Sequence, residues 1–223
     1  MKKGGLKEIV TPLHQATPRK YLARMQDEKA HCMEVARRYG KDFWDGDRKY
    51  GYGGYKYDGR WSVVAEKFIE QYNLKDGDKI LDVGCGKGFL LYEVKKLLPN
   101  CTVAGFDISR YAVANAKEEV REKLFVHNAA NTPWCYEDNE FDFAFSLATL
   151  HNLKINELQG ALADLNRVAK KQYLMVESYR NEVEQFNLQC WALTCYSFYT
   201  PEEWIWLFEH FGYCGDYEFI YFE

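Results

Sequence analysis

Short apolar runs alternate with amphipathic segments from residue 61 to residue 223. The apolar runs predict strands over 80–83, 102–106, 124–127, 141–146, 173–177 and 216–222. The amphipathic segments predict helices over 61–72, 89–98, 109–121, 155–169, 182–195 and 201–211. Strands that alternate with helical segments of about 10–15 residues are typical of parallel βαβ units. The pattern therefore predicts an α/β fold, a Rossmann-like doubly wound and mostly parallel sheet of about six to seven strands with helices on both faces.

The first 60 residues follow a different pattern. Residues 1–17 are polar and interrupted by glycine and proline, so we expect them to be loosely held. A rough helical stripe of apolar positions predicts a helix over 19–39, with Gly40 after its end. Residues 43–60 alternate glycine, tyrosine and charge without a regular period, which predicts a loop long enough to be functional. We expect an N-terminal helix and lid loop over 1–60, followed by a ligand-binding domain over 61–223.

Charge is unevenly distributed between these two parts. The whole chain carries 29 Lys and Arg against 33 Asp and Glu, a net charge of −4. Residues 1–60 hold 14 of the basic residues and 8 of the acidic ones, so the front segment is basic and the rest is acidic. This asymmetry favours an anionic ligand for the front segment; the alternative is a solvated basic surface with no partner.

The seven cysteines form no C-x-x-C pair and no zinc-ligand spacing, so no metal site is predicted. No apolar leader precedes them, and no run is long enough to span a membrane. We therefore expect a cytoplasmic protein with reduced cysteines and no membrane contact.

Three alternating glycines follow the strand predicted at 80–83. The sequence from Asp82 reads Asp-Val-Gly-Cys-Gly-Lys-Gly, which places glycines at 84, 86 and 88 before a helix. Glycine lets the backbone turn tightly and approach a ligand closely, and a helix N-terminus presents free N–H groups. The spacing differs from the G-x-G-x-x-G of dinucleotide folds, which argues against an NAD-linked oxidoreductase.

Polar residues also follow the next two strands. Asp107 ends the second strand, where a carboxylate can accept hydrogen bonds from both hydroxyls of a ribose. Ile108 would then flank a flat base, and Asn128 with Ala129 would meet the polar edge of that base. Because the carboxyl ends of parallel strands lie at one edge of a sheet, these residues should lie close together.

Together, Asp82–Gly88, Asp107, the 128–134 loop, the 141–146 strand and the 199–204 helix start resemble the class I S-adenosylmethionine-dependent methyltransferases, small-molecule branch. The resemblance implies S-adenosylmethionine as cofactor. The cofactor-binding residues that we predict are Asp82, Gly84, Cys85, Gly86, Gly88, Asp107, Ile108, Asn128, Ala129 and Ser146, with Tyr52, Tyr55 and Arg60 from the lid loop. Two features depart from the family: Asn replaces the more frequent Asp at 128, and the C-terminus is too short for the usual closing hairpin. We therefore expect one final strand.

Methyl transfer requires mainly that a nucleophile be held in line with an activated methyl group, and such positioning supplies roughly 7–11 kcal/mol. A base is needed only for a hydroxyl or a protonated nitrogen. His151 and Tyr57 are the predicted catalytic residues, although His151 also fits a purely structural role. Glu177 is a further carboxylate that could face the site. Arg48, like Arg60, could receive an anion.

The function that the sequence favours is methylation of a small, anionic metabolite such as a sugar, a nucleotide-sugar or an acid. A pI of 5.8 argues against a broad nucleic-acid surface, and Ser146-Leu-Ala-Thr149 stands where nucleic-acid amino-methylating enzymes carry Asp/Asn-Pro-Pro-Tyr. The alternatives are a tRNA or protein methyltransferase and a non-catalytic cofactor-binding protein. The aromatic segment 186–199 either lines the acceptor pocket or forms a homodimer face.

Overall fold

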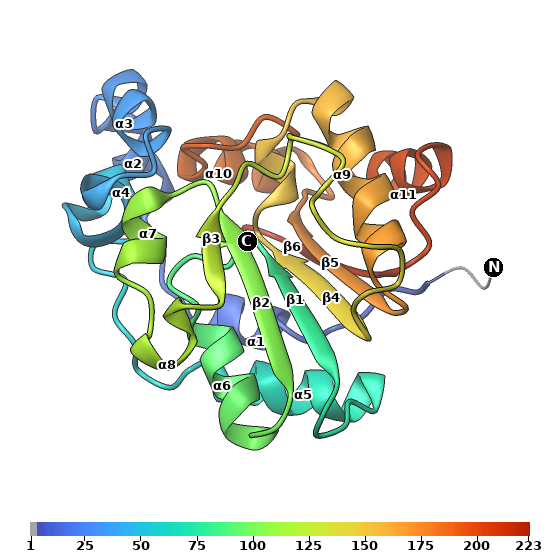
Figure 1. The fold of residues 1–223 in the computed structure, drawn as a ribbon. Helices are drawn as coiled ribbons and strands as arrows, with labels where there is room; N and C mark the ends of the chain where they lie inside the picture. Colours follow the sequence, from blue (N-terminus) through green and yellow to red (C-terminus); the bar gives the residue numbers. More distant parts are fainter. Residues whose placement is uncertain (1–3) are drawn as a thin grey trace.

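The computed structural model of the protein describes residues 4–223 and is built around one parallel β-sheet (Figure 1). The strands are β1 (Lys79–Val83), β2 (Thr102–Asp107), β3 (Leu124–Val126), β4 (Phe143–Leu147), β5 (Gln172–Glu177) and β6 (Asp216–Ile220). Their order is β3-β2-β1-β4-β5-β6, and each neighbouring pair is parallel. The predicted α/β fold is confirmed, with a sheet that is wholly rather than mostly parallel among the described residues.

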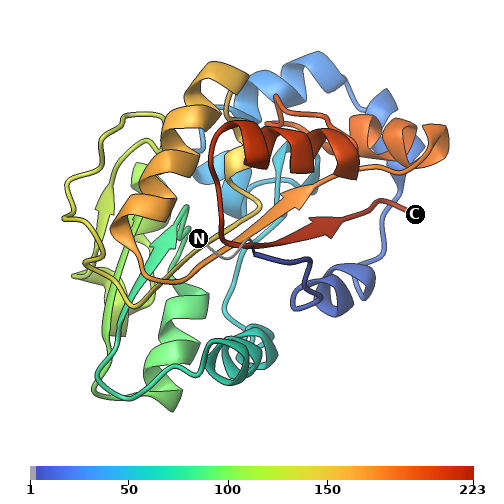
Figure 2. The same cartoon turned by 90° about the vertical axis from the view of Figure 1, so that its right-hand side faces the viewer.

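Helices cover both faces of the sheet (Figure 2). On one face lie α5 (Ser62–Tyr72) and α6 (Phe89–Leu97), and on the other α9 (Ile155–Val168) and α11 (Pro201–His210). Side chains alternate along each strand, so Ile80 enters the core beneath α5 and α6, whereas Leu81 enters the core beneath α9 and α11. Burial on both faces explains why the strand sequences read as continuous apolar runs.

The N-terminal segment is firmly docked, which corrects the expectation that residues 1–17 are loosely held; residues 1–3 lie outside the described part. Leu6 pairs with Tyr217 in a parallel bridge along β6, and α1 (Thr11–Gln15) follows. The buried Glu218 carboxylate accepts the N–H groups of Ile9 and Val10 at 2.6 and 2.9 Å. These contacts fix the segment and cover the outer edge of the last strand.

Two helices that the sequence predicts as continuous are broken. The helix predicted over 19–39 is divided into α2 (Tyr21–Gln26) and α3 (Lys29–Ala36), because Glu28 adopts a left-handed conformation with φ of 48°. The helix predicted over 109–121 is divided into α7 (Arg110–Ala114) and α8 (Glu118–Arg121). Local apolar spacing shows neither break, because a turn of two or three residues interrupts a helix without changing the pattern on each side.

The predicted loop over 43–60 is partly helical. It begins within α4 (Lys41–Asp45) and includes one turn of 3-10 helix, η1 (Arg48–Tyr50). In Figure 1, α2, α3 and α4 lie together at one end of the sheet, beside α7. The fold thus places α2, α3 and α4 next to the strand ends that were expected to bind a ligand.

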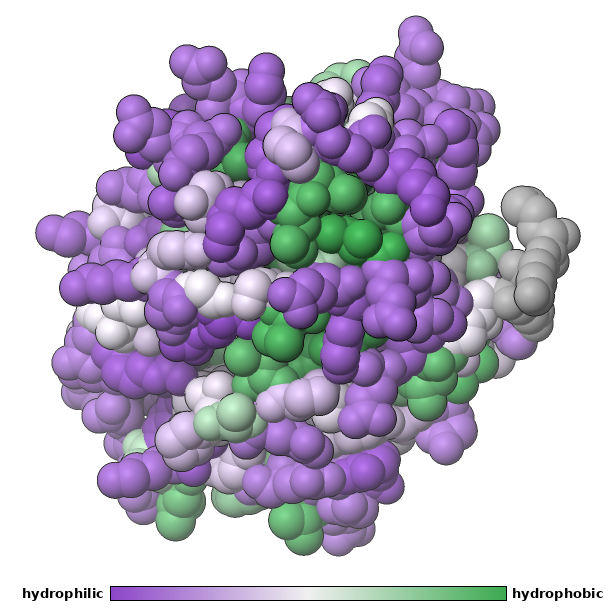
Figure 3. All heavy atoms as spheres, turned by 90° about the horizontal axis from the view of Figure 1, so that it is seen from below, coloured by the Kyte–Doolittle hydropathy of each residue, from purple (hydrophilic) through white to green (hydrophobic). Residues whose placement is uncertain are grey.

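The C-terminal region agrees with the expectation of a single final strand. After α10 (Glu182–Trp191) and α11, the described chain adds β6 alone, parallel to β5. The face seen from below in Figure 3 is mainly hydrophilic, with apolar residues gathered near its middle. Among residues 4–223, no helix has the length and apolar character needed to cross a bilayer. The predicted homodimer stays a prediction.

Candidate cofactor- and acceptor-binding site

A cavity of about 660 Å³ lies at the carboxyl ends of the strands, where Gly84, Asp107, Leu147 and Glu177 follow or end β1, β2, β4 and β5. Parallel sheets bind ligands at this edge, beside the point where the strand order reverses. The volume falls within the roughly 300–1,000 Å³ of small-molecule sites. The cavity is therefore the candidate site.

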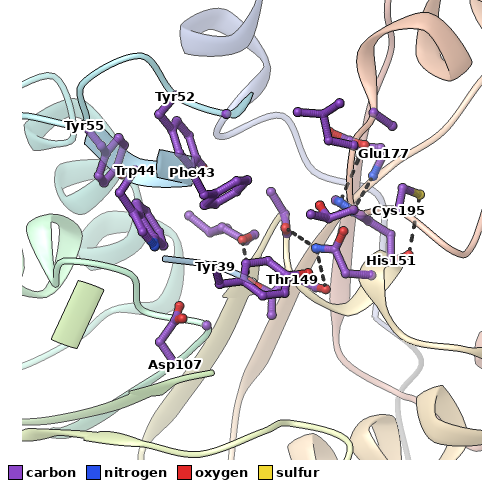
Figure 4. Close-up of a pocket in the computed structure, with 18 of the residues that line it drawn as sticks. Tyr39, Phe43, Trp44, Tyr52, Tyr55, Asp107, Thr149, His151, Glu177 and Cys195 are labelled. Carbon is purple, nitrogen blue, oxygen red and sulfur yellow. Dashed lines mark hydrogen bonds and ion pairs between the residues drawn. The ribbon is translucent and has the colours of Figure 1, made fainter. Parts of the chain in front are cut away.

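Two groups of side chains face each other across this cavity (Figure 4). We call the part lined by Gly84, Asp107, Ile108, Asn128 and Ala129 the Asp107 end. We call the part lined by Arg19, Arg24, Arg48, His151, Glu177 and Trp191 the Trp191 end. The first comes from consecutive strand ends, and the second from segments far apart in the sequence.

At the Asp107 end, the glycine turn leads from β1 into α6 and is hydrogen-bonded to β2. The N–H groups of Gly84 and Cys85 donate to the Phe106 carbonyl at 2.8 and 3.0 Å. Gly84 has φ of 86°, and a Cβ there would lie 2.0 Å from Thr149 Oγ1. Only glycine fits this conformation and this close approach, so the turn leaves its backbone bare beside the cavity.

Asp107 is held in one orientation by two backbone donors. Its Oδ1 accepts the Ser109 N–H at 2.7 Å, and its Oδ2 accepts the Gly86 N–H at 2.9 Å. Burial raises the pKa of this carboxyl, and the two N–H donors oppose that shift. Ile108 follows it with 45% of its surface exposed. A fixed carboxylate beside an uncovered apolar side chain fits a ribose carrying a flat base.

Aromatic side chains from the N-terminal segment cover the glycine turn. The Trp44 ring lies against Gly86, where a Cβ would be 2.8 Å from it, and stacks on Tyr52 at 5.1 Å. Its Nε1 donates to Ser109 Oγ at 2.9 Å. Tyr55 stacks on Phe89, the first residue of α6, at 4.9 Å. The predicted lid loop is thus packed directly on the turn.

A buried ion pair anchors this lid. Lys87, inside the glycine turn and 5% exposed, donates to both Asp45 carboxylate oxygens at 2.8 and 2.7 Å and to the Tyr55 carbonyl at 2.9 Å. Tyr111 Oη donates to the same carboxylate at 2.8 Å. Burial raises the pKa of Asp45, but the hydrogen bonds from Lys87 and Tyr111 outweigh it and lower the pKa. The lid is therefore fixed to the turn electrostatically as well as by packing.

At the Trp191 end, His151 and Glu177 form a buried pair. His151 Nδ1 accepts the backbone N–H of Glu177 at 3.2 Å, so the neutral ring carries its proton on Nε2. That nitrogen lies 3.5 Å from Glu177 Oε2. Burial lowers the pKa of His151, while the Glu177 carboxylate opposes the shift. Glu177 contacts both ring nitrogens of His151, one through its backbone N–H and the other through Oε2. Neither ring nitrogen is therefore available to a ligand, whereas the second carboxylate oxygen of Glu177 is.

Nine of the predicted site residues line the cavity: Gly84, Asp107, Ile108, Asn128, Ala129, Tyr52, Tyr55, Arg60 and His151. Within the described chain, Asp82, Cys85, Gly86, Gly88, Ser146 and Tyr57 do not. Cys85, Gly86 and Gly88 belong to the turn itself, and Ser146 Oγ donates to the Val83 carbonyl at 2.8 Å, just before the turn. Their direct contact with the cofactor stays a prediction.

The position of Tyr57 does not fit a catalytic role. Its hydroxyl donates to the buried Glu93 carboxylate of α6, and its ring packs edge-on against Phe89 and Tyr92. The Lys117 ammonium also lies 4.8 Å from the centre of the Tyr57 ring, and Tyr57 is not among the residues that line the cavity. We therefore do not retain it as a catalytic candidate.

The sequence reasoning did not single out Trp44, Asp45, Lys87, Thr149 or Asn152. Trp44, Asp45 and Lys87 act through partners distant in the chain, so no local spacing indicates them. The aromatic segment 186–199 is partly explained, since Trp191 and Tyr196 line the cavity whereas Phe186 is half exposed.

A methyltransferase domain family matches residues 74–212, well over half of the chain. The chain belongs to this family. It is a class I S-adenosylmethionine-dependent methyltransferase domain, as its motifs predict, and its cofactor is S-adenosylmethionine. The fixed Asp107 carboxylate, the bare backbone at Gly84 and the uncovered Ile108 fit that cofactor.

Relatives of this methyltransferase domain differ widely in substrate. An uncharacterized protein of Methanocaldococcus jannaschii is 33% identical over 56% of this chain and 46% of its own length. The (S)-tetrahydroprotoberberine N-methyltransferase of Eschscholzia californica is 32% identical over 41% of this chain and 27% of its own. A sterol 24-C-methyltransferase of Gibberella zeae is 31% identical over 49% and 31%. The chain thus spans less than half the length of these curated relatives.

Solved structures confirm the fold. A methyltransferase of Haloferax volcanii, in complex with the Trm112 methyltransferase activator, has a TM-score of 0.56 at 16% identity over 88% of this chain and 77% of its own. Geranyl diphosphate methyltransferase in complex with S-adenosylmethionine has a TM-score of 0.54 at 15% identity, over 67% and 63%. At these identities the likeness shows the fold alone.

Proposed function

We propose that the protein transfers a methyl group from S-adenosylmethionine to an oxygen or nitrogen of a small, anionic metabolite, such as a sugar, a nucleotide-sugar or a carboxylic acid. The observation that carries this proposal is that one cavity joins the Asp107 end to the Trp191 end. In-line transfer requires donor and nucleophile in contact, so both must lie in one enclosed space.

The cofactor supplies an already activated methyl group, so the chain has to bind, orient and exclude water. Asp107, Ile108 and Asn128 fit the ribose and base, and Gly84 gives close access to the turn. The faces of Trp44, Tyr52 and Tyr55 lie beside that turn, where aromatic rings favour a cationic centre. The lid therefore contributes a dry wall to the cofactor end.

Glu177 is the group that we assign as general base. Its carboxylate lines the cavity, and an oxygen of it can take the proton of an acceptor hydroxyl as the bond to the methyl carbon forms and the methyl–sulfur bond breaks, or the proton of an ammonium before its nitrogen attacks. His151 is assigned a positioning role in place of the predicted base role, because both its nitrogens are occupied by Glu177. His151 accepts the backbone N–H of Glu177 at Nδ1 and contacts the Glu177 carboxylate through Nε2. These two contacts fix the orientation of Glu177.

The size and charge of the Trp191 end support a small anionic acceptor. Arg19, Arg24 and Arg48 line it, and none forms an ion pair with a carboxylate within residues 4–223. The basic residues of the front segment thus point to an anion inside a cavity rather than to a broad phosphate-binding face, which a tRNA acceptor would need. Seven free thiols agree with a cytoplasmic, reducing compartment.

The test is methyl transfer from isotopically labelled S-adenosylmethionine to a panel of sugar phosphates, nucleotide-sugars and carboxylic acids, with bulk tRNA and an uncharged sugar as comparators. We expect label in one of the anionic small molecules. Label in tRNA, together with a salt-dependent gel shift, would replace this function with nucleic-acid methylation. Tight cofactor binding without transfer to any class would favour a non-catalytic protein.

A further inference from the structure

Three arginine side chains converge on one indole at the Trp191 end. The guanidinium carbons of Arg24, Arg48 and Arg19 lie 4.4, 4.9 and 5.3 Å from the centre of the Trp191 ring. Arg19 precedes α2, Arg24 lies in α2, and Arg48 lies in η1, so all three come from the N-terminal segment. Trp191 ends α10, so the cluster exists only because these segments meet.

Backbone carbonyls hold the guanidinium groups without neutralising them. Arg24 Nε donates to the Trp191 carbonyl at 2.9 Å and its Nη1 to the Arg48 carbonyl at 2.8 Å. Arg19 Nη1 donates to the His14 and Thr17 carbonyls at 3.0 and 2.9 Å. Burial, followed by repulsion from Arg48, lowers the pKa of Arg24 to about 10. The positive charges are therefore pre-oriented and partly desolvated, which is unfavourable without an anion.

Unpartnered polar atoms occur in the same cavity. Among the described residues, two buried side-chain polar atoms lack a hydrogen-bond partner, Arg19 Nε and Asn152 Oδ1, and both residues line this cavity. Buried polar groups are nearly always satisfied, so each such atom calls for an explanation. A ligand with an anionic oxygen for Arg19 Nε and a donor for Asn152 Oδ1 satisfies both.

We propose that Arg19, Arg24 and Arg48, arranged around Trp191, form a subsite for a phosphoryl or pyrophosphoryl group of the methyl acceptor. This inference rests on the proposed methyl transfer and narrows its acceptor to a phosphorylated compound. Among the residues that define the lining of this end, three guanidinium groups and the Glu177 carboxylate leave two positive charges in excess; Asp27, which also acts on Arg24, lies outside the lining. One carboxylate on a ligand would leave this excess half neutralised, whereas a phosphoryl group of about −1.5 to −2 matches it. Guanidinium forks also bind phosphate oxygens in pairs.

The test measures binding of inorganic pyrophosphate and of succinate by calorimetry, to protein loaded with S-adenosylhomocysteine so that the cofactor end is filled. We expect pyrophosphate to bind more tightly than succinate. Arg24→Gln and Arg48→Gln should each weaken pyrophosphate binding by at least about tenfold, since each removes a charge-assisted contact. Arg38→Gln is the matched control, because Arg38 is exposed and outside the cavity lining.

Affinity for S-adenosylhomocysteine and the melting temperature, measured on every variant, show that the fold is retained. Arg48→Gln is the milder change, since Arg48 is exposed and, besides its contact with Trp191, its guanidinium makes one hydrogen bond in the described chain, from Nη1 to the Gly51 carbonyl. Equal binding of succinate and pyrophosphate, or pyrophosphate affinity equal in Arg48→Gln, Arg38→Gln and wild type, would overturn the subsite.

The result for the phosphoryl subsite can be distinguished from the result for the proposed methyl transfer. Pyrophosphate binding that depends on the arginines supports the subsite even if no acceptor is methylated. Methylation of a carboxylic acid that neither pyrophosphate nor Arg24→Gln reduces would support the function and overturn the subsite.

Discussion

The Asp107 end of the cavity is built from residues 82–129, which are close in sequence, and its polar groups are satisfied within the protein, as Asp107 is by Ser109 and Gly86. The Trp191 end is assembled from Arg19, Arg24, Arg48, His151, Glu177 and Trp191, and it holds an excess of positive charge and the unpartnered Nε of Arg19. An end whose polar groups already have hydrogen-bond partners suits a cofactor that binds in every turnover. An end whose polar groups lack partners until a ligand supplies them favours the one acceptor that can do so, which makes that end selective for its substrate.

The largest effect that distinguishes the two ends is expected for Glu177→Gln. Loss of the carboxylate should lower kcat by roughly 10²–10⁴-fold, the usual contribution of a general base, with the affinity for S-adenosylhomocysteine unchanged. Steady-state kinetics on the acceptor found by the labelling panel, with calorimetry for the cofactor product, measure both quantities.

The positioning role of His151 has a distinct signature. His151→Asn should lower kcat less than Glu177→Gln does, and Glu177→Gln should leave little further effect for His151→Asn in the double variant. Additive losses in kcat would mean that His151 acts on the substrate independently of Glu177.

Next in size is the anchor between the lid and the glycine turn. Removing one partner of the Lys87–Asp45 pair leaves a largely buried charge unpaired, so Lys87→Met should lower the free energy of unfolding by roughly 2–4 kcal/mol. Urea unfolding measures this. In the double variant with Asp45→Asn, much of the loss should be recovered. The exposed pair Arg60–Asp58 is the matched control, and Arg60→Met should cost less than about 1 kcal/mol.

Asp107→Ala should affect the Asp107 end alone. Removing the charged acceptor should raise the Kd of S-adenosylhomocysteine by roughly 10–150-fold, with pyrophosphate binding at the Trp191 end unchanged. Calorimetry with each probe measures the two ends separately. The exposed Asp138 provides a control, and Asp138→Ala should change neither affinity. An unchanged Kd in Asp107→Ala would refute the ribose assignment.

The smallest effect concerns His14, which supports Arg19 at the Trp191 end. Burial, then Arg19, lowers the pKa of His14 to about 4. Because the folded pKa lies below the unfolded value near 6.5, the native state binds fewer protons and stability falls as the pH drops from about 6.5 to 4. The loss should be about 1–2 kcal/mol and should largely disappear in His14→Gln, as measured by urea unfolding at pH 7 and pH 4.5. A pH dependence equal to that of the wild type would exclude His14.

The Asp107 end is built from neighbouring segments and the Trp191 end from distant ones, and this difference also explains which predictions could be made from the sequence. The predicted strands, the turn at Gly84 and the placement of Asp107 and Asn128 beside it follow from short segments and from the rule that parallel strands end at one edge. The breaks at Glu28 and within 109–121 were missed, because one residue with positive φ in the first case, and a three-residue turn in the second, leave the apolar period intact. The docking of residues 4–17 was missed because its main anchor, Glu218, is over 200 residues away.

The sequence by itself determined the parallel α/β sheet, the methyltransferase domain family and the cofactor end, because these depend on side-chain period, glycine conformation and neighbouring strand ends. Only the tertiary structure decided that Lys87 anchors the lid through Asp45, that His151 faces Glu177 and that three arginines meet over Trp191. Electrostatic and hydrogen-bond contacts act over a few ångströms in space without regard to distance along the chain, so the fold has to be formed before such groups can be seen together.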